Sequence, residues 1–418
     1  MTRPVGSGPA TYEAGEARAA EAREPSGLFA APLVRVVTPV WGAWLVATVA
    51  AVFLLTASGL IDPASRGAGG RLWPLWSWDW GWYSAIARVG YPPHPSPAYA
   101  FFPLWPAVLR ASGPLPEWVL GGIVALAATL LAFAGVAAAH GARPRQTALV
   151  LACFPGSVWL ALVYPDALTV AAAAWACVFA ARGRPLAAAA TGALAAVARP
   201  TGFLVAVPVF LLARRAGGRA WPAALAPLAA AAAVEGYFWA RSGAANAFFS
   251  AQRDWHRTGP SPVAWWHQYG VTVHAHPAAT AATFALALVL SLAAWRRPRH
   301  RIALALGAFA LVAAWNAVAG PIEQIEVERA AAAVVVVLCG LLWTLGPSHR
   351  IWAAYATTVV GVSLVSGSVQ SFGREALLAF PLVFAVQDGP PVLRRRSVAA
   401  LGIAANVVLL WTLGRFAP

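Results

Sequence analysis

The chain has 418 residues, of which 60% are hydrophobic and 11% are charged. A soluble domain carries about 25% charged residues, so this composition excludes an ordinary soluble fold and indicates a helical membrane protein. The net charge of +15 comes from 30 arginines without any lysine, and because most of them stand in short clusters between apolar runs, they indicate membrane topology rather than a nucleic-acid partner.

In chain order, residues 1–30 lack any hydrophobic periodicity and are predicted to form a disordered cytoplasmic tail. Residues 31–418 are predicted to form one integral membrane domain. We expect an all-α, polytopic transmembrane helix bundle of about 11–13 membrane segments, with loops and interfacial helices on its outer face. The expected segments lie near 35–60, 117–139, 147–163, 167–181, 186–198, 200–213, 220–240, 278–295, 301–318, 330–345, 350–366, 376–388 and 396–413.

The connections between these segments differ in charge. With the tail inside, the arginine clusters that begin at Arg143, Arg182 and Arg214 fall in short cytoplasmic turns. Most acidic residues then fall on the outer side, and they are Asp62, Asp79, Glu117, Asp166, Asp254, Glu323, Glu326, Glu328 and Glu375. This predicts a multi-pass protein of the cell membrane with a polar outer face.

The sequence gives little support for a metal site or a disulfide bond. The cysteines Cys153, Cys177 and Cys339 lie inside apolar segments, without the spacing of metal ligands. His274 and His276 stand two residues apart, with no acid or cysteine adjacent. We therefore expect neither a metal site nor a cofactor.

The densest aromatic stretch is WSWDWGWYSAIARVGY, residues 76–91, followed by AYAFFPLWP, residues 98–106. Its rings suit the headgroup layer of a membrane, and AIARVGY is predicted to form a short interfacial helix. Asp79 stands between tryptophans, where desolvation disfavours the charged form unless a cation offsets it. From the residues alone, a structural role and a role as general base are both open for Asp79.

This stretch resembles the first-loop signature of the PIG-V-type mannosyltransferases, the family of the second mannosyltransferase of GPI-anchor assembly, which has bacterial members. The matching residues are Trp78, Asp79, Trp82, Tyr83, Ile86, Ala87, Gly90, Tyr91, Phe101, Phe102, Pro103, Leu104, Trp105 and Pro106. Shorter similarities follow in the same order along the chain: YPDAL with Asp166 in place of the family's Glu, ARPTGF with Arg199, and SFGREALLAFPLVFA with Arg374.

The resemblance implies a GT-C-class glycosyltransferase, a many-helix protein with its active site on the extracytoplasmic face. It implies an inverting transfer of mannose from polyprenyl-phosphate-mannose, with Asp79 as the essential acid of the first outer loop. Trp78, Trp82, Tyr83 and Asp166 become candidates for the substrate pocket. The acceptor is a hydroxyl on a glycolipid, a polysaccharide or a protein, and membrane lipids are the surrounding partners.

The chemistry of such a transfer assigns further roles. The leaving group is a lipid phosphate, whose charge requires cations, and arginine offers a bidentate fork to phosphate. Arg199 and Arg374 lie in irregular segments on the expected outer face and are candidates for this role. For Arg199 a solvated turn is the alternative, and for Arg374 an ion pair with Glu375.

A second outer cluster, AQRDWHRTGPSPVAWWHQ, spans residues 251–268. Its side chains suit either a sugar site or an interfacial belt, and the substrate-binding candidates in it are Gln252, Asp254, Trp255 and His256. Glu235 lies inside an apolar run, where it is either functional or buried in a hydrogen bond. The rival reading of the whole chain is an ion-coupled transporter or lipid flippase, which would show paired broken helices and charges near the membrane midplane.

Overall fold

The computed structural model describes residues 31–60, 72, 74, 75, 78–255, 257, 324–365, 372–394 and 396–413. Within these ranges the secondary structure is helical and contains no strand. The α-helices are α2 (Ala31–Ala57), α3 (Asp79–Val89), α4 (Leu104–Arg110), α5 (Glu117–His140), α6 (Pro144–Ala152), α7 (Asp166–Ala181), α8 (Pro185–Ala198), α9 (Ala206–Arg215), α10 (Leu225–Ser242), α11 (Ala247–Asp254), α15 (Gln324–Thr344), α16 (Arg350–Val365), α17 (Phe372–Glu375), α18 (Leu382–Asp388) and α19 (Arg396–Leu413).

Three helical stretches of the described chain are long and apolar enough to cross a bilayer. They are Pro32–Ala57, Glu117–His140 and Trp221–Ser242. Shorter apolar helices span Asp166–Ala181, Pro185–Ala198 and Val334–Thr344. The expectation of a helical, membrane-associated protein is therefore confirmed at this coarse level, while the two segments expected at 278–295 and 301–318 and the tail 1–30 lie outside the described residues.

Two of the expected segments are broken. Residues 147–163 do not form one helix, because α6 ends at Ala152 and a separate 3₁₀ helix covers Ser157–Ala161. Gly156 at this break has φ 89°, and a Cβ there would lie 2.9 Å from the carbonyl oxygen of Gly373. The expected segment 376–388 is likewise divided, with the 3₁₀ turn Ala376–Leu378 preceding α18, which begins after Pro381.

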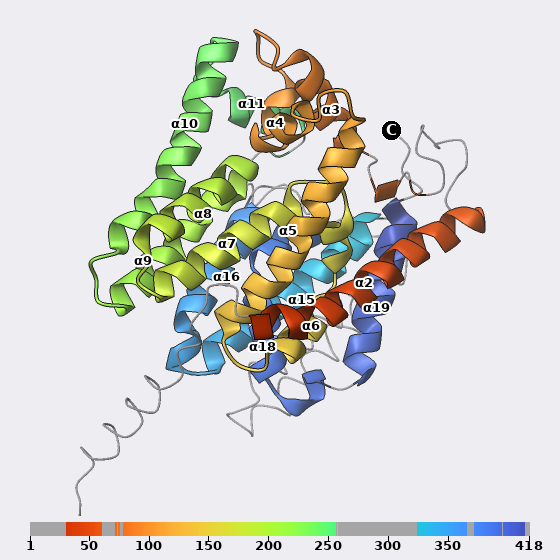
Figure 1. The fold of residues 1–418 in the computed structure, drawn as a ribbon, viewed down its shortest axis with the longest axis vertical. Coiled ribbons are helices and arrows are strands. Elements are labelled where there is room, and N and C mark those ends of the chain that lie inside the picture. The colour runs from red at the N-terminus through yellow and green to blue at the C-terminus, as the bar shows by residue number, and fades with distance from the viewer. Residues whose placement is uncertain are drawn as a thin grey trace, which may run out of the picture.

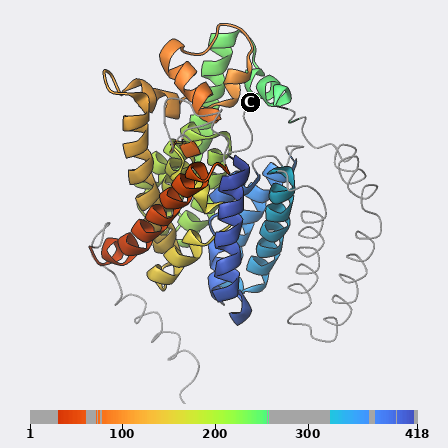
Figure 2. The same ribbon diagram turned by 90° about the vertical axis from the view of Figure 1, so that its right-hand side faces the viewer.

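Helix α7 is the core of the packed helices. It lies against α5 and α8, and α8 in turn packs on α10 (Figure 1). Nearly all of α7 is buried, and alanine is its commonest residue. Small side chains let helix backbones approach closely in a membrane environment, where apolar area alone gives little driving force for association. In Figure 2 the later helices α15 and α19 stand side by side, and they contact one another.

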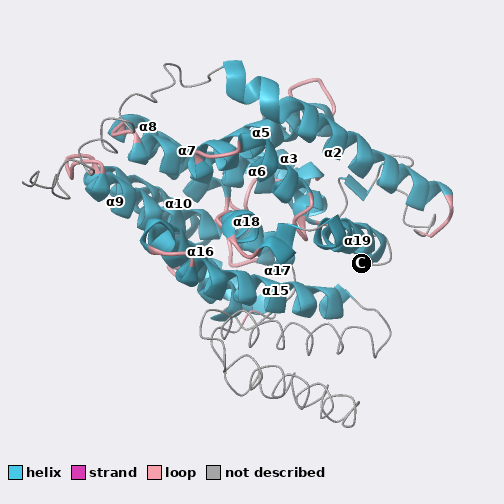
Figure 3. Cartoon of the chain, turned by 90° about the horizontal axis from the view of Figure 1, so that it is seen from below, coloured by secondary structure: helices cyan, strands magenta, loops and turns pink. Residues whose placement is uncertain are grey.

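The packed helices have two distinguishable ends, which α5 connects. At its first residue, Glu117 accepts a hydrogen bond from Ser84 of α3, and at its last, His140 contacts Asp388 of α18. A helix of 24 residues spans about 36 Å. We call these the Asp79 end, with α3, α4 and α11, and the Asp388 end, where Figure 3 shows α18 among α6, α15 and α16.

The Asp79 end carries a cap of aromatic side chains. Tyr91 donates a hydrogen bond to the Phe101 carbonyl at 2.6 Å, and the Trp105 indole donates to the Val163 carbonyl at 3.2 Å. Tyr91, Phe102 and Trp105 are buried and form one cluster with Phe238 of α10. Much of the first-loop signature therefore builds a packed scaffold around Asp79.

The chain reverses between α8 and α9 at ARPTG (Figure 1). Arg199 precedes Pro200 and is extended, with φ −148° and ψ 149°, as expected for a residue before proline. A 3₁₀ turn over Pro200–Val205 follows and packs back onto α8. Gly202 makes this possible, because a Cβ there would lie 1.9 Å from the Ala195 carbonyl oxygen.

Gly202→Ala is therefore expected to destabilise the fold by about 1–3 kcal/mol through overpacking against a backbone oxygen. The matched control is Gly236→Ala in α10, where a Cβ meets nothing within 4 Å and the higher helix propensity of alanine favours folding by about 0.5–1 kcal/mol. Thermal unfolding of both variants in detergent checks this. Equal melting temperatures for the two variants would contradict the close approach at Gly202.

Candidate functional site

Four residues far apart in sequence converge at the Asp79 end. Arg374 Nη1 donates to an oxygen of Asp79, and its Nε lies 3.0 and 2.9 Å from the two carboxylate oxygens of Asp166. Arg199 Nη1 donates to the same Asp166 carboxylate. The structure thus brings together the predicted acid of the first loop, both predicted phosphate-binding arginines and Asp166.

Local sequence places each of these groups. Asp79 and Asp166 are the first residues of α3 and α7, where the positive end of the helix dipole stabilises a carboxylate. Pro165 directly precedes α7, and α8 ends at Ala198, so that Arg199 lies between the helix and Pro200. The short α17 carries Arg374 with its side chain buried.

Arg374 is the centre of this network. Its guanidinium carbon lies 4.8 Å from the ring centroid of Tyr164 and 5.6 Å from that of Trp159. Burial disfavours its charged form, but Asp166 and Asp79 outweigh this and hold the pKa of Arg374 well above its ordinary value. A permanently charged guanidinium is thus kept out of water by two carboxylates and two aromatic rings.

The alternatives considered for the two arginines are wrong in this structure. Arg199 is no solvated turn residue, since its side chain is 15% exposed and pairs with an Asp166 side chain that is 2% exposed. Glu375 does not pair with Arg374. It accepts a hydrogen bond from Arg257, which follows α11.

The Arg257–Glu375 pair is the contact near the network that sequence reasoning missed. In the sequence Glu375 is next to Arg374, which suggests an ion pair. Adjacent residues in a helix, however, point in different directions. Arg257 lies in the predicted outer cluster, for which the sequence assigned no pairing. Together with the network around Arg374, the pair brings three arginines and three carboxylates to one region, so their formal charges balance.

Two of the predicted substrate-binding aromatics lie in contact. The Trp82 ring stacks on Phe101 at 5.6 Å and meets the Trp255 ring edge-on at 5.7 Å. The Trp255 indole also donates to the Pro97 carbonyl at 3.3 Å. The α11 segment is therefore fastened to the first loop through Trp255.

Tyr83 joins this aromatic group to the ionic network. Its ring lies 6.3 Å from that of Tyr164, which lies under Arg374. Burial raises the pKa of Tyr83, an effect that the nearby Arg374 charge only partly opposes. The Tyr83 phenol therefore stays neutral beside the ionic network.

Trp78 holds Asp79 at a strained position. The backbone of Trp78 has φ 58° and ψ −109°, an uncommon conformation for a residue with a side chain. Its ring packs against Trp159 at 6.0 Å. The turn of the chain at Trp78 starts α3 so that the Asp79 carboxylate faces Arg374.

Other predicted site residues lie outside the network. Asp254 is exposed, and Gln252 is half-buried and uses its backbone carbonyl to accept a hydrogen bond from the Arg257 amide at 2.8 Å. His256 is outside the described residues, as are His274 and His276. In the described ranges, no group of three or more histidine, cysteine or acidic residues is arranged to hold a metal ion.

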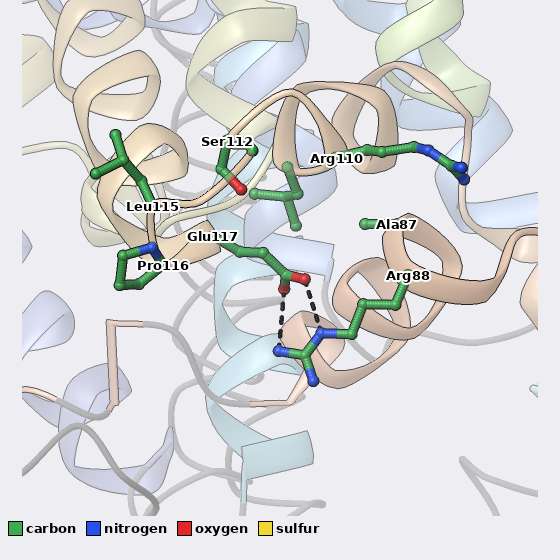
Figure 4. A pocket seen from close by; sticks show the side chains of 9 residues that line it. Ala87, Arg88, Arg110, Ser112, Leu115, Pro116 and Glu117 are labelled. Atoms are coloured by element: carbon green, nitrogen blue, oxygen red, sulfur yellow. Dashed lines mark hydrogen bonds and ion pairs between the residues drawn. The ribbon is translucent and has the colours of Figure 1, made fainter.

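Little empty space lies beside Asp166 and the two arginines. A cavity of about 10 Å³ lies beside Asp166, Arg199, Thr201 and Arg374, which is room for about one water molecule. A larger cavity of about 340 Å³ lies at the other end of α3, beside Arg88, Arg110 and Glu117 (Figure 4). It does not border Asp79, and its Glu117 is paired with Arg88 at 2.7 Å.

Comparison of the chain with protein-family models, with curated proteins and with solved structures gives no match. The similarity of the first loop to the PIG-V-type mannosyltransferases therefore stays a prediction, and so do the roles that it implies.

Asp166→Asn is expected to destabilise the protein by about 3–5 kcal/mol, because it leaves the buried Arg374 charge incompletely compensated. Asp254→Asn, at an exposed aspartate, is the control and is expected to change stability by at most about 0.5 kcal/mol. Denaturant or thermal unfolding in detergent measures both. If the two substitutions proved equally mild, Asp166 would not anchor the arginines.

Proposed function

We propose that the protein is an inverting glycosyltransferase of the cell membrane, a mannosyltransferase that uses a polyprenyl-phosphate-linked sugar on the extracytoplasmic face. The observation that carries this proposal is the contact of Asp79 with Arg374, with Arg199 on the same Asp166 carboxylate. Asp79 is the acid, and Arg374 and Arg199 are the two cations, that the reaction requires. They come from three separate parts of the chain. The proposal includes a polytopic bundle of which the three long apolar helices are part.

The reaction assigns the residues as follows. Asp79 takes the proton of an acceptor hydroxyl, whose oxygen forms a bond to the anomeric carbon of the donor sugar. The bond from that carbon to the phosphate oxygen breaks on the opposite face, and the electron pair leaves with the lipid phosphate. Arg374 and Arg199 stabilise this phosphate as its charge increases. No acid is required on the leaving group, because a phosphate leaves readily.

The ion pair between Asp79 and Arg374 adds a condition to this mechanism. While Asp79 accepts a hydrogen bond from Arg374, its carboxylate and the cation neutralise each other. A donor phosphate that approaches Arg374 competes with Asp79 for the guanidinium, while Asp166 keeps hold of Arg374 Nε. Binding of the donor therefore separates the acid from the arginine, opens space for the sugar and frees Asp79 to act as a base.

Asp166 then has a different role from the one predicted for it. It is 2% exposed and holds both arginines, so it positions the phosphate-binding groups and does not touch the sugar. The acceptor remains a hydroxyl on a glycolipid, a polysaccharide or a protein.

Asp79→Asn tests the proposal. Asparagine retains an oxygen that accepts from Arg374, so the protein is expected to accumulate and unfold normally, while sugar transfer falls by about 10²–10⁴-fold through loss of the base. The measurement is transfer of labelled mannose from polyprenyl-phosphate-mannose to a membrane acceptor fraction.

Glu117→Gln is the matched control, since Glu117 is also a carboxylate paired with an arginine at the Asp79 end, outside the network. It is expected to retain transfer within a few-fold. Equal transfer by Asp79→Asn and the wild type would refute the role of Asp79. Ion-coupled uptake without sugar transfer in the wild type would favour the transporter or flippase instead.

A further inference from the structure

At the Asp388 end, one carboxylate oxygen holds two histidines from different helices. Asp388 Oδ2 lies 2.8 Å from His140 Nε2 and 3.0 Å from His349 Nε2. His140 ends α5, His349 directly precedes α16, and Asp388 ends α18. The side chains are partly shielded, with exposed fractions of 6% for His140, 18% for His349 and 29% for Asp388.

The contacts of His140 determine its protonation. Its Nδ1 lies 2.5 Å from the Ala142 carbonyl oxygen, which can only accept a hydrogen bond. Its Nε2 faces Asp388, which also only accepts when ionised. Both ring nitrogens must therefore carry a proton, so the geometry requires the imidazolium form beside an ionised Asp388.

His349 is less constrained. Its Nδ1 lies 3.2 Å from the hydroxyl oxygen of Ser348, which can donate or accept. The ring can therefore donate to Asp388 as a neutral imidazole or as an imidazolium. The three-way contact consequently depends on the second proton of His140 more than on that of His349.

The other polar groups near Asp388 do not substitute for its contacts with the two histidines. Within the described residues, Arg143, Arg145 and Arg350 lie on the adjoining segments, and none forms an ion pair with Asp388. Phe384 packs on the His140 ring at 5.0 Å. Thr147 donates to Gln387 at 2.6 Å, a neutral hydrogen bond that does not change with pH.

The segment fastened by Asp388 also carries Arg374. From Phe372 to Asp388 the chain passes through α17, a 3₁₀ turn and α18 with few non-helical residues between them. Arg374 is near its start and Asp388 at its end, so the segment joins the ionic network at one end of the molecule to the histidines at the other. Two such anchors fix its position along its length.

We propose that His140, Asp388 and His349 form a proton-dependent clamp that positions the segment Phe372–Asp388, and with it Arg374. The link to Arg374 activity rests on the proposed function, whereas the clamp itself does not.

The direction of the pH dependence follows from the contacts. Burial opposes ionisation of Asp388, but hydrogen bonds from His140 and His349 outweigh this and lower its pKa. Its contribution to stability is thus present above the ordinary value for aspartate, about 3.9, and is lost as pH falls through the lowered pKa. When His140 loses its second proton, one ring nitrogen is left with a lone pair that faces an acceptor, either the Asp388 carboxylate or the Ala142 carbonyl oxygen. The clamp therefore weakens when His140 becomes neutral, which rising pH favours.

Thermal unfolding of the full chain in detergent, from pH 5.5 to 8.5, tests the clamp. The wild type is expected to lose several degrees of melting temperature toward pH 8.5. Asp388→Asn is expected to melt lower than the wild type at pH 5.5–6, and this difference should shrink toward pH 8.5, because asparagine can accept or donate and does not require the imidazolium. His94→Gln, at an exposed histidine, is the control and should keep the wild-type profile. Parallel profiles for the wild type and Asp388→Asn would overturn the clamp.

Hydrogen exchange tests the positioning of the segment without any assay of activity. At pH 6, peptides from residues 372–388 of Asp388→Asn should exchange several-fold faster than those of the wild type at the same pH, and this ratio should approach one at pH 8.5. Faster exchange confined to residues near 388 would overturn the positioning of Arg374. If thermal unfolding and hydrogen exchange both give the expected results and no sugar transfer is detected, the proposed function fails while the clamp stands.

Discussion

The arrangement at the Asp79 end depends on one buried carboxylate, Asp166, that holds two arginines. A guanidinium cannot lose its charge in a protein interior, so Arg374 can remain buried only with anions beside it. Asp166 is the shared partner, since it is 2% exposed and contacts both Arg374 and Arg199. Asp79 supplies a second anion from a more exposed position, with 26% of its side chain accessible. This difference allows one acid to be structural and the other to be exchangeable.

The aromatic residues around Asp79 serve this arrangement mainly by rigidity. Tyr91 and Trp105 hydrogen bond to backbone carbonyls, and Trp82 joins the first loop to α11 through Trp255. Rings packed in this way fix the start of α3, where the strained backbone of Trp78 directs the carboxylate toward Arg374. Such support suits the base proposed at Asp79, because small errors in the position of a catalytic group reduce the rate strongly.

Sequence patterns predicted the helices well where a local signal existed. The segments expected near 167–181 and 186–198 match α7 and α8 closely, and the apolar stretches near 35–60, 117–139 and 220–240 overlap the three helices long enough to span a membrane. The break at Pro155–Gly156 was overlooked, because the apolar composition on either side continues across it. What Gly156 provides is a close approach to the Gly373 carbonyl, a contact between distant segments that no local pattern contains.

The candidate site was likewise predictable from local signals, but not where it depends on contacts between distant segments. The first-loop motif pointed to Asp79, the phosphate chemistry pointed to Arg199 and Arg374, and the family resemblance pointed to Asp166, so all four members of the network were predicted site residues. Sequence could not reveal that Asp166 is shared by both arginines, that Glu375 pairs with Arg257, or that Asp388 joins two histidines at the other end. Such pairings depend on how helices pack, and a charged residue in a sequence carries no mark of its partner.

The most direct measurement is an experimental structure of the full chain in lipid nanodiscs with a non-hydrolysable polyprenyl-phosphate-sugar analogue. We predict that its phosphate lies on Arg374 and Arg199, that Asp166 still holds both arginines, and that Asp79 has moved from Arg374 to face the anomeric carbon. An analogue bound elsewhere, with the contact between Asp79 and Arg374 intact, would contradict the proposed role of this network.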